Sequence, residues 1–209
     1  MEILRHGVVL SAILLLMSAE AHADLLVNGD FSQGPIVRHG WKPVPKGKKT
    51  IEAWHVKQNS VDYVTTYWQQ PTGAVASLDM NGTATKRNES PNQPGVLAQS
   101  FATEAGTAYQ LTFYLSANPA GGPDLRTMVV KVGNTRAHFR WNIENERNTL
   151  SDMKWKLETV AFTAAAASTE LKFISTTKIG VFGPAIALVS VDPAAPMRMA
   201  SPGPAPGLR

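Results

Sequence analysis

Few residues of this sequence could carry out catalysis. The chain has no cysteine, which excludes thiol nucleophiles, disulfides and thiolate metal sites. Beyond residue 23 the histidines are His39, His55 and His138, and their spacing matches no metal-binding motif. The sequence also lacks a Gly-x-Ser-x-Gly elbow, a P-loop and a dinucleotide-binding motif. Although acidic residues are present, no spacing marks two of them as a glycosidase pair, so we expect no enzyme.

Aromatic and planar polar side chains offer a different chemistry, because aromatic rings stack on the apolar face of sugars while amides, carboxylates and guanidinium groups bind hydroxyls. The segment Tyr67-Trp68-Gln69-Gln70 precedes Pro71 in a polar loop. Two adjacent aromatic residues cannot both be buried on one face of a strand. We therefore expect one or both rings to be exposed as a platform, with a packed loop as the alternative.

A second candidate is the segment His138-Phe139-Arg140-Trp141, in which basic and apolar residues alternate. If Phe139 and Trp141 face the core, His138 and Arg140 project together from the open face of a strand. The alternative is an ordinary charged solvent face. The complete set of candidate ligand-binding residues is Tyr67, Trp68, Asn118, Arg126, His138, Arg140 and Trp141.

Asp62 and Asp79 lie between apolar neighbours in strand-like segments. A carboxylate in such a position is rarely buried without a partner. We expect Arg126 to supply one, and such a buried pair would act structurally. Asn118 lies in a loop rich in proline and glycine, where it could bind a ligand or cap the end of a strand.

Alternation of period two dominates the sequence after Asp24 and predicts β-strands. Tyr109, Leu111, Phe113 and Leu115 share one face of the clearest run. The apolar phase of residues 155–162 slips near Thr159, which a β-bulge would explain. Other predicted strands cover residues 96–101, 127–132, 169–175 and 185–191. No window has a helical pattern, so the sequence predicts a single antiparallel β-sandwich or barrel.

Several ordered segments resemble a known family: Leu25-Leu26-Val27-Asn28-Gly29-Asp30-Phe31, Trp54-His55-Val56, Ser77-Leu78-Asp79-Met80-Asn81-Gly82 and Gly183-Pro184-Ala185-Ile186. From about Leu25 to Val191 the chain resembles the bacterial choice-of-anchor C family and the related DUF642 domain of plant cell-wall proteins. The resemblance implies a galactose-binding-like jelly roll, an extracellular or cell-surface location and no established enzyme activity. It also implies an association with cell-wall polysaccharides, which fold alone does not demonstrate.

Two departures from the resemblance affect the expected cofactors and anchoring. Ala187 stands where the family usually has an acidic residue that, in related sandwiches, often helps to hold calcium. Asn28 and Asp30 remain as weak metal candidates, but calcium needs six to eight oxygen ligands. We therefore expect no cofactor. The end of the chain has neither a hydrophobic span nor a wall-sorting motif.

The N-terminus predicts export. Arg5 precedes an apolar run from Gly7 to Met17, and Ala21-His22-Ala23 forms a signal-peptidase motif. Because a membrane-spanning helix needs about 20 apolar residues, we interpret residues 1–23 as a cleaved signal peptide. The predicted domain is then 24–192, followed by a disordered tail over 193–209, and the protein is expected to be extracellular or periplasmic.

These features favour an exported, non-catalytic module that binds extracellular or cell-wall polysaccharide. The alternative is a structural or protein-interaction domain of the envelope or matrix with no sugar ligand. The formal net charge is +4, and Lys42, Lys46, Lys48 and Lys49 form a basic loop that could meet an anionic polysaccharide or a membrane, or could simply be solvated. We find no nucleic-acid motif and no membrane span, and the oligomeric state is left open.

Overall fold

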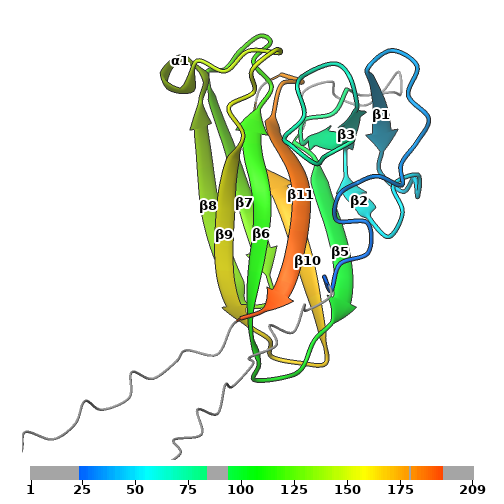
Figure 1. The fold of residues 1–209 in the computed structure, drawn as a ribbon, viewed down its shortest axis with the longest axis vertical. Helices are drawn as coiled ribbons and strands as arrows, with labels where there is room; N and C mark the ends of the chain where they lie inside the picture. The colour runs from blue at the N-terminus through cyan, green and yellow to red at the C-terminus, as the bar shows by residue number, and fades with distance from the viewer. Residues whose placement is uncertain (1–23, 84–93, 179, 195–209) are drawn as a thin grey trace, which may run out of the picture.

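The computed structural model describes residues 24–83, 94–178 and 180–194. These residues form two antiparallel β-sheets that pack face to face, with the long strands running side by side (Figure 1). The predicted all-β sandwich of the jelly-roll type is therefore confirmed. The expected signal peptide and almost all of the expected tail lie outside the described residues.

The first sheet has six strands in the order β1-β3-β4-β11-β6-β9. Its strands are β1 (Trp41–Pro45), β3 (Ser60–Val64), β4 (Ser77–Asp79), β11 (Pro184–Pro193), β6 (Ala108–Ala117) and β9 (Lys156–Thr163). Strand β1 lies at one edge, where Pro43 and Pro45 are tolerated because an edge strand does not need every backbone N–H group.

The second sheet has five strands in the order β2-β5-β10-β7-β8. They are β2 (His55–Gln58), β5 (Val96–Ala102), β10 (Ser168–Ser175), β7 (Leu125–Val132) and β8 (Thr135–Asn142). The register of β9 against β6 is continuous, so the bulge predicted near Thr159 is wrong. The apolar phase slips because Leu157 faces solvent, with 59% of its surface exposed.

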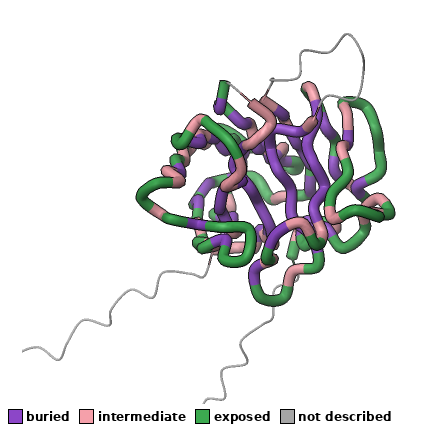
Figure 2. The backbone as a smooth tube through the Cα atoms, turned by 90° about the horizontal axis from the view of Figure 1, so that it is seen from above, coloured by how far each residue is buried: buried purple, intermediate pink, exposed green. Residues whose placement is uncertain are grey.

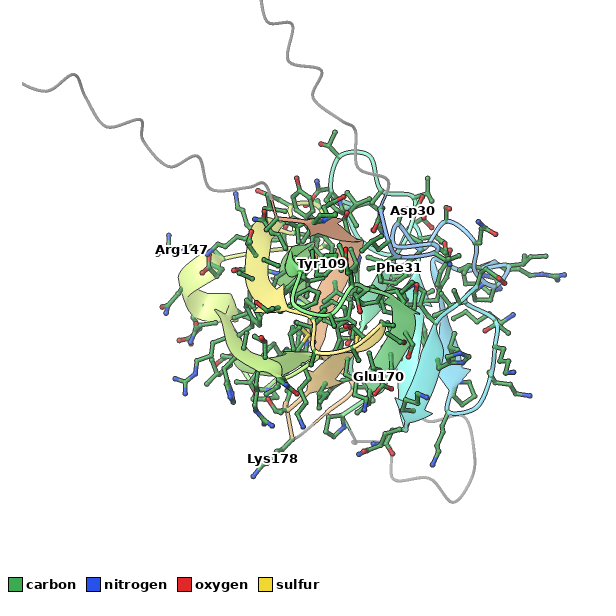
Figure 3. All side chains as sticks on the ribbon, turned by 90° about the horizontal axis from the view of Figure 1, so that it is seen from below. Asp30, Phe31, Tyr109, Arg147, Glu170 and Lys178 are labelled. Carbon is green, nitrogen blue, oxygen red and sulfur yellow. The ribbon has the colours of Figure 1, made fainter. Side chains whose placement is uncertain are left out.

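The main core fills the space between the sheets, where the buried strands gather inside a rim of exposed loops (Figure 2). Trp54 lies within it, with its ring centroid 5.3 Å from that of Phe31 and 6.3 Å from that of Phe173. The indole N–H of Trp54 donates to the carbonyl oxygen of Asn28, which satisfies its buried polar atom. From below, Phe31 and Tyr109 lie towards the middle, while Arg147 and Lys178 extend outward (Figure 3).

A second, smaller cluster covers the outer face of the six-stranded sheet. It contains Val64, Trp68, Met153 and Ala185. Because this cover lies over β3 and β4, every residue of those two strands is buried, on both faces of the sheet. Polar residues of β3 and β4 that would otherwise face water are therefore enclosed.

The described helix, α1 (Ile143–Glu146), has four residues, and Asn142 caps it by accepting from the backbone N–H of Asn145. Within the described ranges, no helix is long and apolar enough to cross a membrane.

Candidate functional site

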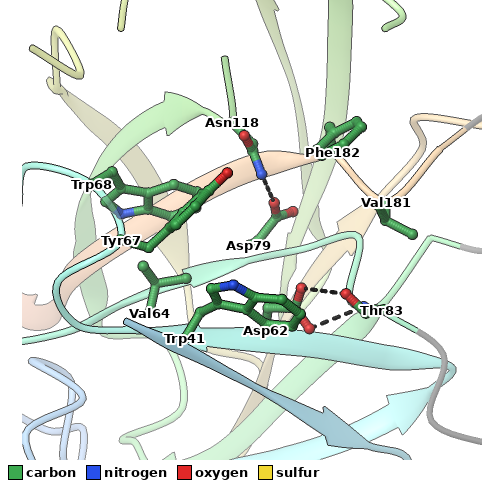
Figure 4. A pocket seen from close by; sticks show the side chains of 10 residues that line it. All are labelled: Trp41, Asp62, Val64, Tyr67, Trp68, Asp79, Thr83, Asn118, Val181 and Phe182. Carbon is green, nitrogen blue, oxygen red and sulfur yellow. Dashed lines mark hydrogen bonds between the residues drawn. The ribbon is translucent and has the colours of Figure 1, made fainter. Parts of the chain in front are cut away.

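A small pocket opens on the outer face of the six-stranded sheet, over β1, β3 and β4 (Figure 4). Its volume is about 90 Å³. We call it the Trp41 pocket, and its lining residues are Trp41, Asp62, Val64, Tyr67, Trp68, Asp79, Thr83, Asn118, Val181 and Phe182.

Two aspartates form the floor of the Trp41 pocket. Asp62 of β3 and Asp79 of β4 are directly opposite each other in the antiparallel register, so their side chains leave the same face of the sheet. Asp79 is only 1% exposed. The alternation of the strands thus points both carboxylates outward, and the outer cover buries them.

Each carboxylate already accepts hydrogen bonds. The backbone N–H and the hydroxyl of Thr83 donate to the two oxygens of Asp62, at 2.9 and 3.0 Å. Asp79 accepts from the backbone N–H groups of Asn81 and Gly183, both at 2.9 Å, and from the side-chain amide of Asn118 at 2.8 Å. These bonds fix the floor and offset part of the cost of burying it.

Burial controls the protonation of the floor. Burial raises the pKa of Asp79 to about 8, and the nearby Asp62 carboxylate adds to this increase. The hydrogen bonds that Asp79 accepts act in the opposite direction and lower its pKa. Burial raises the pKa of Asp62 to about 6, while the bonds from Thr83 oppose it. Burial thus favours the protonated form of both carboxyl groups, more strongly for Asp79 than for Asp62.

The loops behind the floor are held by close backbone contacts. A Cβ atom on Gly183 would lie 2.7 Å from Oδ1 of Asp79, so only glycine allows this approach. Arg126 is fully buried, and its Nη2 donates to the carbonyl oxygens of Asn118 at 3.1 Å and of Gly121 at 2.8 Å. The guanidinium group thereby fixes the loop that carries Asn118.

The walls of the Trp41 pocket are aromatic. Trp68 is buried, and its indole N–H donates to the hydroxyl of Ser77 at 2.8 Å. Tyr67 is half-buried, and its ring centroid lies 5.8 Å from that of Trp68. Trp41 is 36% exposed, and Phe182 stands on the opposite side from Tyr67 (Figure 4). A ligand can therefore reach Trp41, Tyr67 and Phe182, whereas Trp68 backs the wall.

The carbonyl oxygen of Gly40 joins the segment that precedes β1 to the wall. It accepts from the backbone N–H groups of Thr65, Thr66 and Tyr67, at 2.8, 3.2 and 3.3 Å. Gly40 has a φ of 84°, and a Cβ atom there would lie 3.0 Å from the backbone nitrogen of Tyr67. The residue at position 40 thus sets the distance between Trp41 and Tyr67.

We expect Gly40→Ala to lower the free energy of unfolding by about 1 kcal/mol more than Gly47→Ala does. Gly47 is the matched control because its φ is 80° and nothing lies within 4 Å of a Cβ atom built on it. Both variants carry the same backbone strain, and only Gly40→Ala adds the contact with Tyr67. Urea denaturation of both variants measures the difference, and equal losses would show that the contact is unimportant.

The structure brings together some of the residues predicted from the sequence. Tyr67, Trp68 and Asn118 line the Trp41 pocket, and Arg126 lies behind Asn118. Arg126 forms no salt bridge with Asp62 or Asp79 among the described residues, so the expected ion pair is wrong. Its Nη2 donates to backbone carbonyls, whereas its buried Nε and Nη1 have no hydrogen-bond partner in the described part of the chain. Burial lowers the pKa of Arg126, and the charge of the nearby Asp79 opposes this effect. The tyrosine–tryptophan platform is thus half enclosed, with Trp68 buried.

The remaining predicted residues lie on the other sheet. His138 and Arg140 are exposed on β8, while Trp141 of the same strand is buried and Phe139 packs against the core. This confirms the predicted alternation, and it also places these residues away from Tyr67 and Trp68. His138 and Arg140 line a separate open pocket of about 310 Å³.

Asn28 and Asp30, the weak metal candidates, take part in a loop. The side chain of Asn28 donates to the carbonyl oxygens of Gln33 and Glu52 and accepts from the N–H of Gln33. Asp30 accepts from the N–H and the hydroxyl of Ser32. Within the described ranges, no group of three or more histidine or acidic residues could hold a metal ion.

Sequence reasoning did not assign Trp41, Thr83 and Phe182 to a site. Trp41 and Phe182 belong to segments far apart in the chain, and only the strand order β1-β3-β4-β11 brings these segments to one face. The useful signal was the pair of aspartates among apolar neighbours, because a buried carboxylate requires nearby polar partners.

The fold and the pocket define the class: an antiparallel β-sandwich with a small cavity on the outer face of one sheet. The chain belongs to the family described as "Protein of unknown function (DUF642)", which matches residues 24–192. The DUF642 part of the resemblance seen in the sequence is thus confirmed. A comparison with curated proteins found no match.

Several solved structures are similar to this chain at low sequence identity. One is the arabinose-bound MgGH51 α-L-arabinofuranosidase, with 13% identity, a TM-score of 0.51, and coverage of 82% of this chain but only 26% of the arabinofuranosidase. Another is TmCBM61 in complex with β-1,4-galactotriose, with 11% identity, a TM-score of 0.42, and coverage of 82% and 99%. A third is CBM35 from Paenibacillus barcinonensis, with 15% identity, a TM-score of 0.41, and coverage of 68% and 94%. These likenesses concern the fold.

Proposed function

We propose that this protein is an exported, non-catalytic module that binds extracellular or cell-wall polysaccharide through the Trp41 pocket. The observation that carries the proposal is the arrangement of two accessible aromatic rings, Trp41 and Tyr67, around a polar floor of Asp62, Asp79 and Asn118 (Figure 4). A pyranose ring has an apolar face that stacks on aromatic rings and hydroxyl groups that bind carboxylates and amides.

The size of the Trp41 pocket limits how much of a polysaccharide can enter it. A volume of about 90 Å³ is well below that of the pockets that enclose drug-sized ligands. The pocket therefore takes only part of one sugar residue, such as a chain end or a side branch, whose ring rests on Trp41 while the rest of the polysaccharide lies outside.

The bonding of the two aspartates favours binding over catalysis. A general acid or base must exchange a proton with the substrate. Here Asp79 is almost fully buried and accepts three hydrogen bonds, while both oxygens of Asp62 accept from Thr83. In this proposal Asp79 holds Asn118 and the loops of the floor in place, and Asp62, the less buried of the two, accepts from a ligand hydroxyl without transferring a proton.

Isothermal titration of the protein with neutral and acidic oligosaccharides tests the proposal. We expect saturable binding of at least one oligosaccharide, without release of reducing sugar on prolonged incubation. If no neutral or acidic glycan binds, the structural or protein-interaction alternative is favoured. Hydrolysis of the bound glycan would instead show that the protein is an enzyme.

A further inference from the structure

A second cavity lies beside the Trp41 pocket, at the sheet edge formed by β1. It has a volume of about 400 Å³ and is lined by Ile36, Arg38, His39, Trp41 and Lys42. We call it the Arg38 pocket. Trp41 lines both cavities, so one aromatic side chain separates them.

The two pockets are joined by backbone bonds. The carbonyl oxygen of Gly40 accepts hydrogen bonds from the backbone N–H groups of residues 65–67. Gly40 lies between two residues of the Arg38 pocket, and Tyr67 lines the Trp41 pocket. Within the Arg38 pocket, Nζ of Lys42 donates to the carbonyl oxygen of Ile36, at 3.4 Å. These bonds fix the backbone next to Trp41, from which the exposed side chains of Arg38 and Lys42 extend.

The charged residues that line the Arg38 pocket are basic, whereas the ionisable carboxyl residues that line the Trp41 pocket are acidic. Arg38 and Lys42 are exposed, and none of the five lining residues is acidic. Among the described residues, the ion pairs involve Lys154, Lys156 and Lys172, so no described carboxylate neutralises Arg38 or Lys42. In contrast, the described residues that line the neighbouring pocket include two acidic residues, Asp62 and Asp79, and no basic one.

We propose that the ligand runs from the Trp41 pocket across Trp41 into the Arg38 pocket, and that it is an acidic glycan. Part of one sugar residue without a charge occupies the Trp41 pocket, and a carboxylate or sulfate group on the adjoining part of the chain pairs with Arg38 and Lys42. A planar guanidinium group and an ammonium group together suit an oxyanion of this kind. This inference rests on the proposed function and adds the class of glycan.

The test compares a neutral galactan oligosaccharide, an oligogalacturonate, its methyl ester and a sulfated galactan by isothermal titration. We expect a charged glycan to bind about tenfold more tightly than its uncharged counterpart, and the advantage to shrink as salt rises from low to physiological concentration. The uronate and sulfate arms show which anionic group is accepted. Equal affinities for charged and uncharged glycans would overturn the inference.

Substitutions then locate the charge recognition. We expect Arg38→Gln and Lys42→Gln each to weaken binding of the charged glycan by about three- to tenfold and to leave binding of the uncharged glycan unchanged. Lys48→Gln is the matched control, because Lys48 lies in a different lysine-rich cavity beyond the other end of β1. An equal effect of Lys48→Gln would show diffuse attraction to a basic surface and would contradict the inference.

Failure of this inference can be separated from failure of the proposed function. If Trp41→Ala weakens binding of every glycan while Arg38→Gln and Lys42→Gln change nothing, the Trp41 pocket binds sugars and the acidic extension is wrong. If no glycan in any arm binds, both are wrong.

Discussion

Replacement of Trp41 by alanine is expected to lower the affinity for a bound glycan by about tenfold or more, equivalent to ~1.4 kcal/mol or above. Trp41 is the most accessible of the aromatic residues that line the pocket, and its ring borders both cavities at the edge of the sheet. Loss of the ring removes the stacking surface for the sugar and opens the wall to water. Because the side chain is already partly exposed, the melting temperature should change little.

Trp155→Ala is the matched control for this substitution. Trp155 is also half-buried on the outer face of the six-stranded sheet, where it lines a separate open groove of about 470 Å³ with Tyr114 and Lys156. We expect Trp155→Ala to change glycan affinity less than twofold. If Trp155→Ala abolishes glycan binding and Trp41→Ala does not, the glycan does not bind in the Trp41 pocket.

The free energy of unfolding is expected to fall as the pH rises from 4 to 8. In the folded protein burial raises the pKa of Asp79 to about 8 and that of Asp62 to about 6, whereas the ordinary value is 3.8. The folded state therefore binds more protons than the unfolded state in this range, and stability decreases with rising pH. At 1.36 kcal/mol per pKa unit, the loss is on the order of several kcal/mol. The part due to Asp62 is lost between about pH 4 and 6, and that due to Asp79 up to about pH 8.

Asp62→Asn should flatten this pH dependence. The asparagine oxygen can accept from the N–H of Thr83 and its amide can donate to the Thr83 hydroxyl, so both hydrogen-bonded positions remain occupied. The substitution removes one titrating group and the like charge that helps to raise the pKa of Asp79. Urea denaturation at several pH values between 5 and 8 gives the slope for each protein.

Asp152→Asn provides the control for the pH series. Asp152 is exposed and paired with Lys154, whose hydrogen bond lowers the pKa of Asp152 below its ordinary range. Because its pKa is lowered, Asp152→Asn should leave the slope of the wild-type protein between pH 5 and 8 unchanged. If Asp62→Asn has the same slope as the wild type, burial does not raise the pKa of Asp62 and this explanation of the pH dependence is wrong.

The strands that border the main core could be predicted because one face meets the core and the other meets solvent. In β6 the residues Tyr109, Leu111, Phe113 and Leu115 are buried, and their alternation in the sequence is the alternation of the sheet. Polar and apolar residues also alternate in β3 and β4, but both faces of these strands are buried. The alternation of residues within a strand cannot show that a loop distant in the sequence packs on its outer face.

The candidate site could be predicted only in part, because the sequence does not show which strands are neighbours in the sheet. Tyr67, Trp68 and Asn118 were recognised by chemical type, but type did not indicate that Trp68 is buried or that Trp41 completes the wall. His138 and Arg140 were read correctly as outward-facing, yet the sheet to which β8 belongs was not visible in the sequence. Strand order, which depends on long-range pairing, decides which side chains meet.

The most direct test of the account is a titration of the ¹⁵N-labelled protein with its glycan, followed through the indole N–H signals of its five tryptophans. The indole N–H groups of Trp54, Trp68, Trp141 and Trp155 donate to Asn28, Ser77, Asn148 and Gln69, respectively. Single tryptophan-to-phenylalanine variants assign the signals. We predict that the signal of Trp41 shifts most, that of Trp68 less, and those of Trp54, Trp141 and Trp155 remain in place. A shift of the Trp155 signal without one of Trp41, or no shift at saturating glycan, would contradict the account.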